Sequence, residues 1–122
     1  MTGHKSWLIP DCFYPPHSAP GGEYKSHESI CVLNTGSIDA HIDITLYFEN
    51  RAPIKGFHAV CAAERTHHVR MDSLSGVECA GVPKGVPYAA LVESDVPVVV
   101  QYSRLDATQA ACTLMTTMGY PV

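Results

Sequence analysis

Residues 96–109 constrain the fold of this chain more than any other part of the sequence. They include three consecutive valines, Val98, Val99 and Val100, whose β-branched side chains favour a strand that is buried on both faces. Pro97 has no backbone N–H to donate, so we expect it at the first residue or at the edge of that strand. The polar residues that follow the valines would lie at the rim of a sheet, where a ligand can reach them.

Similar strand signals recur along the whole chain. Residues 40–49 alternate apolar and polar side chains, with Ile42, Ile44 and Leu46 on the apolar face, which predicts a half-buried antiparallel strand. The connection between residues 57–62 and 66–71 is short, so these two segments are predicted to form a hairpin. Further strands are predicted at residues 6–9, 30–33, 88–92 and 98–104, whereas residues 110–118 fit either a helix or a strand.

No segment shows the apolar stripe of an amphipathic helix, and glycine or proline separates the strand signals every ten to fifteen residues. This pattern predicts an all-β fold, an antiparallel β-sandwich or a barrel, built from seven or eight short strands. The 122 residues contain no internal repeat and no linker, so residues 1–122 are expected to form a single domain.

Composition excludes several classes of protein. A hydrophobic content of 46% with 16% charged residues is typical of a globular domain and argues against disorder. No cluster of lysine and arginine is present, so nothing indicates a nucleic-acid partner. The N-terminal residues do not resemble a secretory signal, and no apolar run is long enough to span a bilayer. We therefore expect a cytoplasmic protein without a transmembrane segment.

The five cysteines do not form a recognisable framework. They stand at positions 12, 31, 61, 79 and 112, in an odd number and without a C-x-x-C pair, which argues against disulfides and against a zinc knuckle. Cys31, Cys61 and Cys112 lie in apolar runs, where a free thiol behaves as a small buried hydrophobe. All five are expected to be reduced structural residues.

His67 and His68 are the residues that most suggest a metal. Adjacent residues on a strand point to opposite faces, so both imidazoles cannot ligate one ion in ordinary geometry. No fixed-spacing ligand motif, phosphate loop, dinucleotide fingerprint or nucleophile elbow is present. We predict no metal, no other cofactor and no catalytic residue.

One face of the strand at residues 66–71 carries a row of polar groups. Thr66, His68 and Arg70 present a hydroxyl, an imidazole and a guanidinium, a set that suits recognition of hydroxyl or carboxylate groups. Val69 and Met71 identify the opposite face as the core side. An ordinary solvated face has the same pattern, and this alternative stays open. Arg104 and Asp106 have a similar alternative, in which they only pair with each other or cap a turn.

Several separate blocks of the sequence form a recognisable pattern. The first block runs Ser26-His27-Glu28 and then Ile30-Cys31-Val32-Leu33-Asn34-Thr35-Gly36, and it is followed by Asp39-Ala40-His41-Ile42. The pattern continues at residues 65–70, 96–101 and 103–106 and at Gln109. Together these blocks resemble the sensory rhodopsin transducer family. They stand in the same order and cover nearly the whole chain, which makes the resemblance specific.

This resemblance implies a small cytosolic β-sandwich, related in shape to carbohydrate-binding jelly rolls, that assembles into a homotetramer. The founding member of the family is thought to relay a signal from a membrane photoreceptor, and other relatives are suspected of binding sugars. The polar positions that carry over are His27, Glu28, Arg65, His68, Arg70, Gln101, Arg104 and Asp106. We expect these ligand-binding candidates to converge at one rim or groove of the sandwich.

Three hypotheses for function follow. The favoured one is a non-catalytic binding and signal-transducing protein that recognises a sugar-like or other small polar ligand. The alternative is a cytosolic adaptor that relays a signal from a sensory rhodopsin through protein contacts. The weakest is a metal-assisted enzyme acting on carbohydrate.

Overall fold

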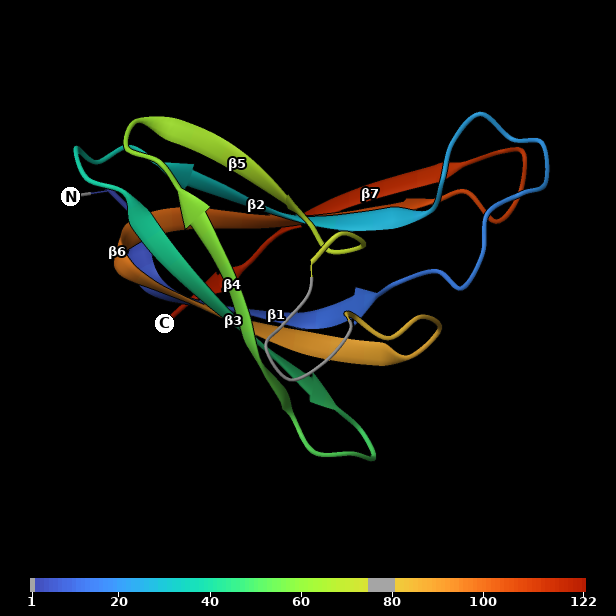
Figure 1. Cartoon of the computed structure of the whole chain (residues 1–122), viewed down its shortest axis with the longest axis horizontal. Helices are drawn as coiled ribbons and strands as arrows, with labels where there is room; N and C mark the ends of the chain where they lie inside the picture. Colours follow the sequence, from blue (N-terminus) through green and yellow to red (C-terminus); the bar gives the residue numbers. More distant parts are fainter. Residues whose placement is uncertain (1, 75–80) are drawn as a thin grey trace.

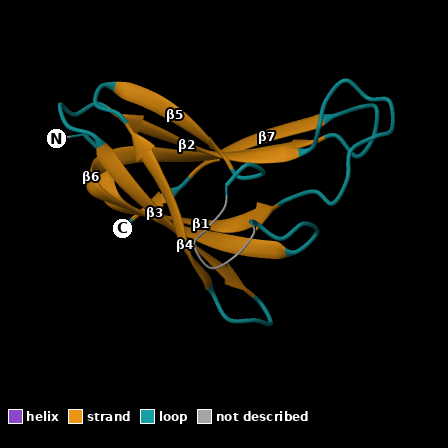
Figure 2. Cartoon of the chain, viewed as in Figure 1, coloured by secondary structure: helices purple, strands orange, loops and turns teal. Residues whose placement is uncertain are grey.

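The computed structural model describes residues 2–74 and 81–122, and the regular structure within them consists of strands only (Figure 2). All ladder pairings between the strands are antiparallel, which confirms the predicted all-β antiparallel fold. The described residues include no helix that is long and apolar enough to cross a membrane. The strands are β1 (His4–Phe13), β2 (His27–Asn34), β3 (Ala40–Phe48), β4 (Ile54–Cys61), β5 (Arg65–Arg70), β6 (Pro87–Asp106), β7 (Thr113–Met118) and β8 (Tyr120–Pro121).

The 20-residue strand β6 belongs to both halves of the molecule. Its first part pairs with β3 and β1, which gives the strand order β4-β3-β6-β1-β8. Its second part pairs with β2 and β7, and β5 adds to β2. Figure 1 shows the two halves meeting at the bend of β6 and opening away from it.

The prediction of two separate strands at residues 88–92 and 98–104 was therefore wrong. The polar residues between them resemble a connection, but they alternate in burial as strand residues do: Glu93 and Asp95 are exposed and Ser94 is buried. Pro97 lies inside β6 rather than at its start. It stands between Ser94, the last residue paired with β3, and the first residues paired with β2, so its missing N–H costs no bond to either strand.

The core lies between the two halves, and its composition follows the period-two pattern of the strands. Ile42, Ile44 and Leu46 are almost fully buried, as their alternation predicted. Burying a side chain of this size contributes about 1.5–3 kcal/mol. Trp7 closes the core near the bend of β6, where its indole Nε1 donates to the carbonyl oxygen of Val98 at 3.0 Å.

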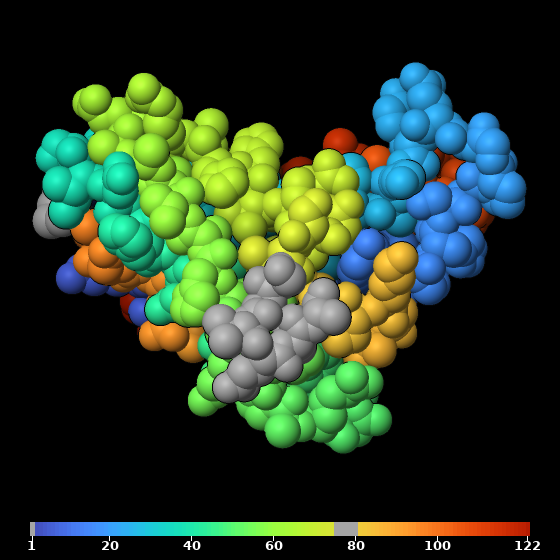
Figure 3. All heavy atoms as spheres, in the orientation of Figure 1, coloured from blue at the N-terminus to red at the C-terminus, as the bar shows by residue number. Residues whose placement is uncertain are grey.

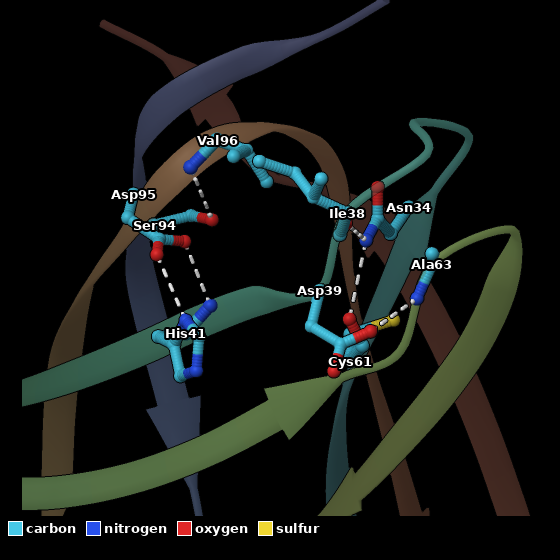
Figure 4. Close-up of polar contacts among 9 residues, drawn as sticks. All are labelled: Asn34, Ile38, Asp39, His41, Cys61, Ala63, Ser94, Asp95 and Val96. Carbon is cyan, nitrogen blue, oxygen red and sulfur yellow. Dashed lines mark hydrogen bonds and ion pairs between the residues drawn. The ribbon is translucent and has the colours of Figure 1, made fainter.

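The predicted hairpin between residues 57–62 and 66–71 was also wrong, because β4 pairs with β3 and β5 pairs with β2. The short connection instead carries the chain from one half to the other. Glu64 has a positive φ of 54° there, and its N–H donates to Gly36 O. The fully buried Asn34 holds the crossing, since its Nδ2 donates to the carbonyls of Ile38 and Cys61 at 2.8 and 3.1 Å (Figure 4).

The ambiguous residues 110–118 contain the strand β7, which pairs with β6. Its threonines fit this outcome, because β-branched residues favour strands. Cys112, just before β7, is exposed, so the expectation that it is buried was wrong; no core element covers the start of this edge strand. Cys12 and Cys61 are buried, Cys31 is half-buried, and all four of these thiols are free, while Cys79 lies outside the described residues.

Candidate functional site

The register of β2 divides the predicted site residues between two faces of the sheet. Residues directly opposite each other in a ladder share a face, and Glu28 stands opposite Arg104. Cys31 stands opposite both His68 and Gln101. Glu28 and Cys31 are an odd number of residues apart, so these two groups lie on opposite faces. The inner face carries Glu28, Arg104 and Asp106, the outer face carries His27, His68, Arg70 and Gln101, and Arg65 lies at the far end of β5 opposite Asn34.

On the inner face, the carboxylate of Glu28 is fully buried and accepts two hydrogen bonds. Tyr88 Oη donates to Oε1 at 2.7 Å, and Tyr102 Oη donates to Oε2. Tyr102 Oη in turn accepts from the backbone N–H of Phe13 at 3.1 Å. Burial raises the pKa of Glu28 above its ordinary value, and this outweighs the lowering by the two tyrosine hydroxyls and by Arg104.

Arg104 completes this inner cluster, which we define as Glu28, Tyr88, Tyr102 and Arg104. Its guanidinium carbon lies 5.9 Å from the ring centre of Phe13 and the same distance from that of Tyr102. Within the described residues, the buried Arg104 Nε makes no hydrogen bond. Burial also raises the pKa of both tyrosines, so they keep their protons at neutral pH and remain donors to Glu28. With Glu28, Tyr88 and Tyr102 all buried, the cluster is suited to holding β2 against β6.

On the outer face, strands β5, β2, β6 and β7 form a hollow of about 240 Å³, which we call the outer-face hollow. His68 and Gln101 stand on either side of Cys31 within it. Thr66 Oγ1 donates to the carbonyl oxygen of Val32 at 3.3 Å. The hollow is lined by Cys31, Val32, Leu33, Thr66, His68, Val99, Gln101 and Met118, a mixture of polar groups and apolar surface.

The remaining candidates lie away from this hollow. His27 is four residues from Cys31, about 13 Å along the strand. Arg70 binds Asp72 through Nε and Nη2 at 2.9 and 2.8 Å. Asp106 Oδ1 accepts from the hydroxyl and the backbone N–H of Thr108 at 2.6 and 3.0 Å, and these bonds hold the pKa of Asp106 below its usual range.

Asp106 thus caps the turn at Thr108, and within the described residues no ion pair joins it to Arg104. Arg65 Nη1 donates to the carbonyl oxygen of its neighbour Glu64 at 2.9 Å. The structure therefore brings Glu28 together with Arg104, and His68 together with Gln101, but it does not bring the eight residues together.

Two exposed histidine–aspartate pairs on the other half of the molecule were not identified from the sequence. Asp95 accepts from the backbone N–H of His41 and bonds its ring Nδ1, both at 2.8 Å (Figure 4). The backbone bond, followed by the ring bond, lowers the pKa of Asp95. In the second pair, His58 Nδ1 bonds Asp43 Oδ1. The alternation of β3 placed His41 and Asp43 on the polar face, but their partners come from other strands.

Metal ligands do not gather anywhere in residues 2–74 and 81–122: no three histidine, cysteine, aspartate or glutamate side chains are arranged there to hold an ion. Large apolar side chains are exposed along β7 and in the C-terminal residues. All six residues of β7 are exposed, and in the described part of the sheet this strand pairs only with β6. The large exposed apolar side chains of this region are Leu114, Met115, Met118, Tyr120 and Val122.

Comparisons with known proteins agree over almost the whole chain. The family model described as Anabaena sensory rhodopsin transducer matches residues 2–121. The crystal structure of Thermotoga maritima 1070 superimposes with a TM-score of 0.87 at 39% identity, covering 100% of this chain and 97% of that one. The structure of the Anabaena sensory rhodopsin transducer gives a TM-score of 0.75 at 37% identity, covering 89% of this chain and 94% of that one. No curated protein matches.

Proposed function

The chain belongs to the sensory rhodopsin transducer family, and on that basis we propose that it is a non-catalytic adaptor that relays a signal from a membrane photoreceptor through protein contacts. The adaptor works in the cytoplasm as a homotetramer. The observation that carries this proposal is the edge strand β7, which is exposed along its whole length and is flanked by large apolar side chains.

An edge strand of this kind is costly to leave uncovered. It presents backbone N–H and C=O groups that can pair with another strand, and natural proteins usually protect such edges. Leu114 is 69% exposed and Met118 is 57% exposed, so the strand offers apolar contacts as well as backbone bonds. Assembly of identical chains through β7 would cover both, and the assembled adaptor would then present one composite surface to the photoreceptor.

The experiment combines sedimentation with capture of the full chain on a sensory rhodopsin in nanodiscs. Leu114→Asp places a charge in the proposed interface, and we expect it to dissociate the tetramer and to abolish capture. Ile38→Asp is the matched control, because Ile38 is 62% exposed but lies in the connection between β2 and β3. A monomeric wild-type protein, or capture that Leu114→Asp leaves unchanged, would refute the adaptor proposal.

A second candidate function is recognition of a sugar-like or other small polar ligand in the outer-face hollow. The observation in its favour is the pairing of His68 and Gln101 across Cys31, beside the apolar side chain of Met118. An imidazole and a carboxamide can each donate and accept hydrogen bonds, and apolar surface suits the C–H face of a sugar ring.

A thermal-shift screen with neutral monosaccharides tests this second function. We expect a stabilising sugar to lose its effect on His68→Ala and Gln101→Ala. Gln109→Ala is the control, since Gln109 is an exposed glutamine outside the hollow. A screen without a stabilising sugar, or an equal loss in the control, would argue against it.

A further inference from the structure

Residues of the loop before β2, together with Asp72 after β5 and Lys84 before β6, line another hollow, of about 300 Å³. In Figure 3 the loop (blue, at the right) lies against the segment that precedes β6 (yellow-orange). This hollow lies at the start of β2, whereas Leu33 of the outer-face hollow lies near the end of that strand. The two hollows share no lining residue. Its lining consists of Tyr14, Pro15, His17, Ser18, Lys25, Ser26, Asp72 and Lys84.

Hydrogen bonds hold the walls of this hollow in place. Ser26 is buried, and its hydroxyl donates to the carbonyl oxygen of His17 at 2.8 Å. The N–H of Ser26 donates to Ser18 Oγ at 2.8 Å, so the Ser18 oxygen is the acceptor in this bond and the hydroxyl proton is not used in it. Gly85 N–H donates to the carbonyl oxygen of Tyr14 at 2.8 Å and ties the second segment to the loop. The hollow is therefore a preorganised feature of the fold.

The charges that line the hollow are predominantly positive. Lys25 and Lys84 each contribute an ammonium group, and neither forms an ion pair within the described residues. The carboxylate in the lining, Asp72, is already bound at both oxygens by Arg70. Burial raises the pKa of Asp72, but the bonds and charge of Arg70 outweigh this and the pKa lies below its usual value. Asp72 is thus ionised, and its charge is balanced by Arg70 rather than by the lysines.

We propose that this hollow, which we call the Lys25–Lys84 pocket, binds the phosphate group of a small phosphate monoester. A phosphate monoester carries a charge of about −1.5 to −2 at neutral pH. This charge balances two ammonium groups, whereas the single charge of a carboxylate ligand would balance only one. Lysine donates to phosphate as a point charge, and the hydroxyl of Ser18 adds a neutral donor. Nothing in the proposed adaptor function requires this pocket.

The size of the pocket and its aromatic wall indicate what the rest of the ligand is like. A volume of about 300 Å³ is at the lower end for ligand pockets, so the ester carries only a small organic group. The ammonium nitrogen of Lys84 lies 5.3 Å from the centre of the Tyr14 ring, a contact that positions this lysine at the wall. The positive charge of this pocket is opposite in sign to the formal net charge of the chain, which is −4.

Calorimetric titration of the full chain with glycerol 3-phosphate tests the proposal. We expect saturable binding that weakens in 0.5 M salt and falls at least tenfold in Lys25→Gln and in Lys84→Gln. Both lysines are exposed, so these variants should fold normally, and their thermal unfolding checks this. Lys55→Gln is the matched control, because Lys55 is an exposed lysine on β4, outside the pocket, and glycerol is the control for the phosphate group.

The same phosphate chemistry occurs in the headgroup of phosphatidic acid, so a second arm uses phosphatidylcholine vesicles with and without that lipid. Binding of glycerol 3-phosphate without retention on the vesicles assigns a soluble ester, and retention without binding of the soluble ester assigns the lipid. The proposal is overturned if neither probe binds, if both lysine variants bind as wild type does, or if Lys55→Gln weakens binding as much as they do.

Discussion

Glu28 and Cys31 stand on the same strand, yet their surroundings are opposite in kind. Glu28 faces inward, where two tyrosine hydroxyls and Arg104 surround its carboxylate and no solvent reaches it. Cys31 faces outward, between an imidazole and a carboxamide that line an open hollow. Successive side chains on a strand point to opposite faces, so odd and even positions of β2 have different surroundings. The comparison shows that this alternation decides whether a polar side chain lies in the core or can reach a ligand.

The largest effect is expected on the inner face. Glu28→Ala removes the acceptor of two buried tyrosine hydroxyls and the carboxylate that interacts with the charge of Arg104. We expect the free energy of unfolding to fall by on the order of 4 kcal/mol, the scale for breaking a buried charged network. Urea denaturation measures the loss. The control is Glu93→Ala, an exposed glutamate on β6, which should cost no more than about 0.5 kcal/mol. Similar losses in the two variants would contradict the contrast between the faces.

Arg104→Ala is the next largest change. It removes the cation from Glu28 and the contact with the Phe13 and Tyr102 rings. We expect a loss of about 2 kcal/mol in unfolding free energy, since hydrogen bonds and contacts of charged groups contribute on this scale. The affinity of the folded variant for glycerol 3-phosphate, or for a stabilising monosaccharide, should equal that of the wild type. A stable variant with weakened ligand binding would instead place Arg104 in a binding site.

A smaller effect is expected in the pH dependence of stability. Because burial raises the pKa of Glu28, the folded state holds this proton more tightly than the unfolded state, whose glutamate pKa is about 4.3. The associated stability is fully present below about pH 4 and is lost as the pH rises through the folded pKa. Glu28→Gln has no such proton to lose, so its stability relative to wild type should increase with pH across this window. Denaturant titrations at a series of pH values measure this, and a constant difference would contradict it.

The smallest effect is expected on the outer face. His68→Ala and Gln101→Ala should each change the unfolding free energy by no more than about 0.5 kcal/mol, because neither side chain supports the core. Thermal unfolding of the two variants checks this. A loss comparable to that of Arg104→Ala would mean that the outer-face hollow is structural.

Local pattern was sufficient for much of the fold. The alternation around Ile42, Ile44 and Leu46 predicted both the strand and its buried face, because side-chain direction on a strand depends only on sequence position. The same rule identified Val69 and Met71 as core residues. It does not reveal which strands pair: the short connection after β4 predicts a hairpin, whereas in the structure it crosses between the two halves.

The site was harder to predict because its contacts are distant in sequence. Tyr88 and Tyr102 reach Glu28 across 60 and 74 residues, so only the assembled sheet brings them together. The polar residues 93–95 predict a connection, yet their alternation of exposed, buried and exposed continues β6. The lysines of the Lys25–Lys84 pocket are likewise far apart in the chain and come together through loops, whose paths are not indicated by periodicity.

The position of β6 after β1–β5 in the chain has a consequence for folding during synthesis. β1 pairs only with β6 and β8 in the described structure, so it has no partner until residues 87–98 have left the ribosome. Before that point only the local β3–β4 pair and the β2–β5 pair can form. Pairings between distant segments close slowly, because loop-closure entropy must be overcome first. Residues 4–86 are therefore expected to stay open to proteases and chaperones until β6 has been made.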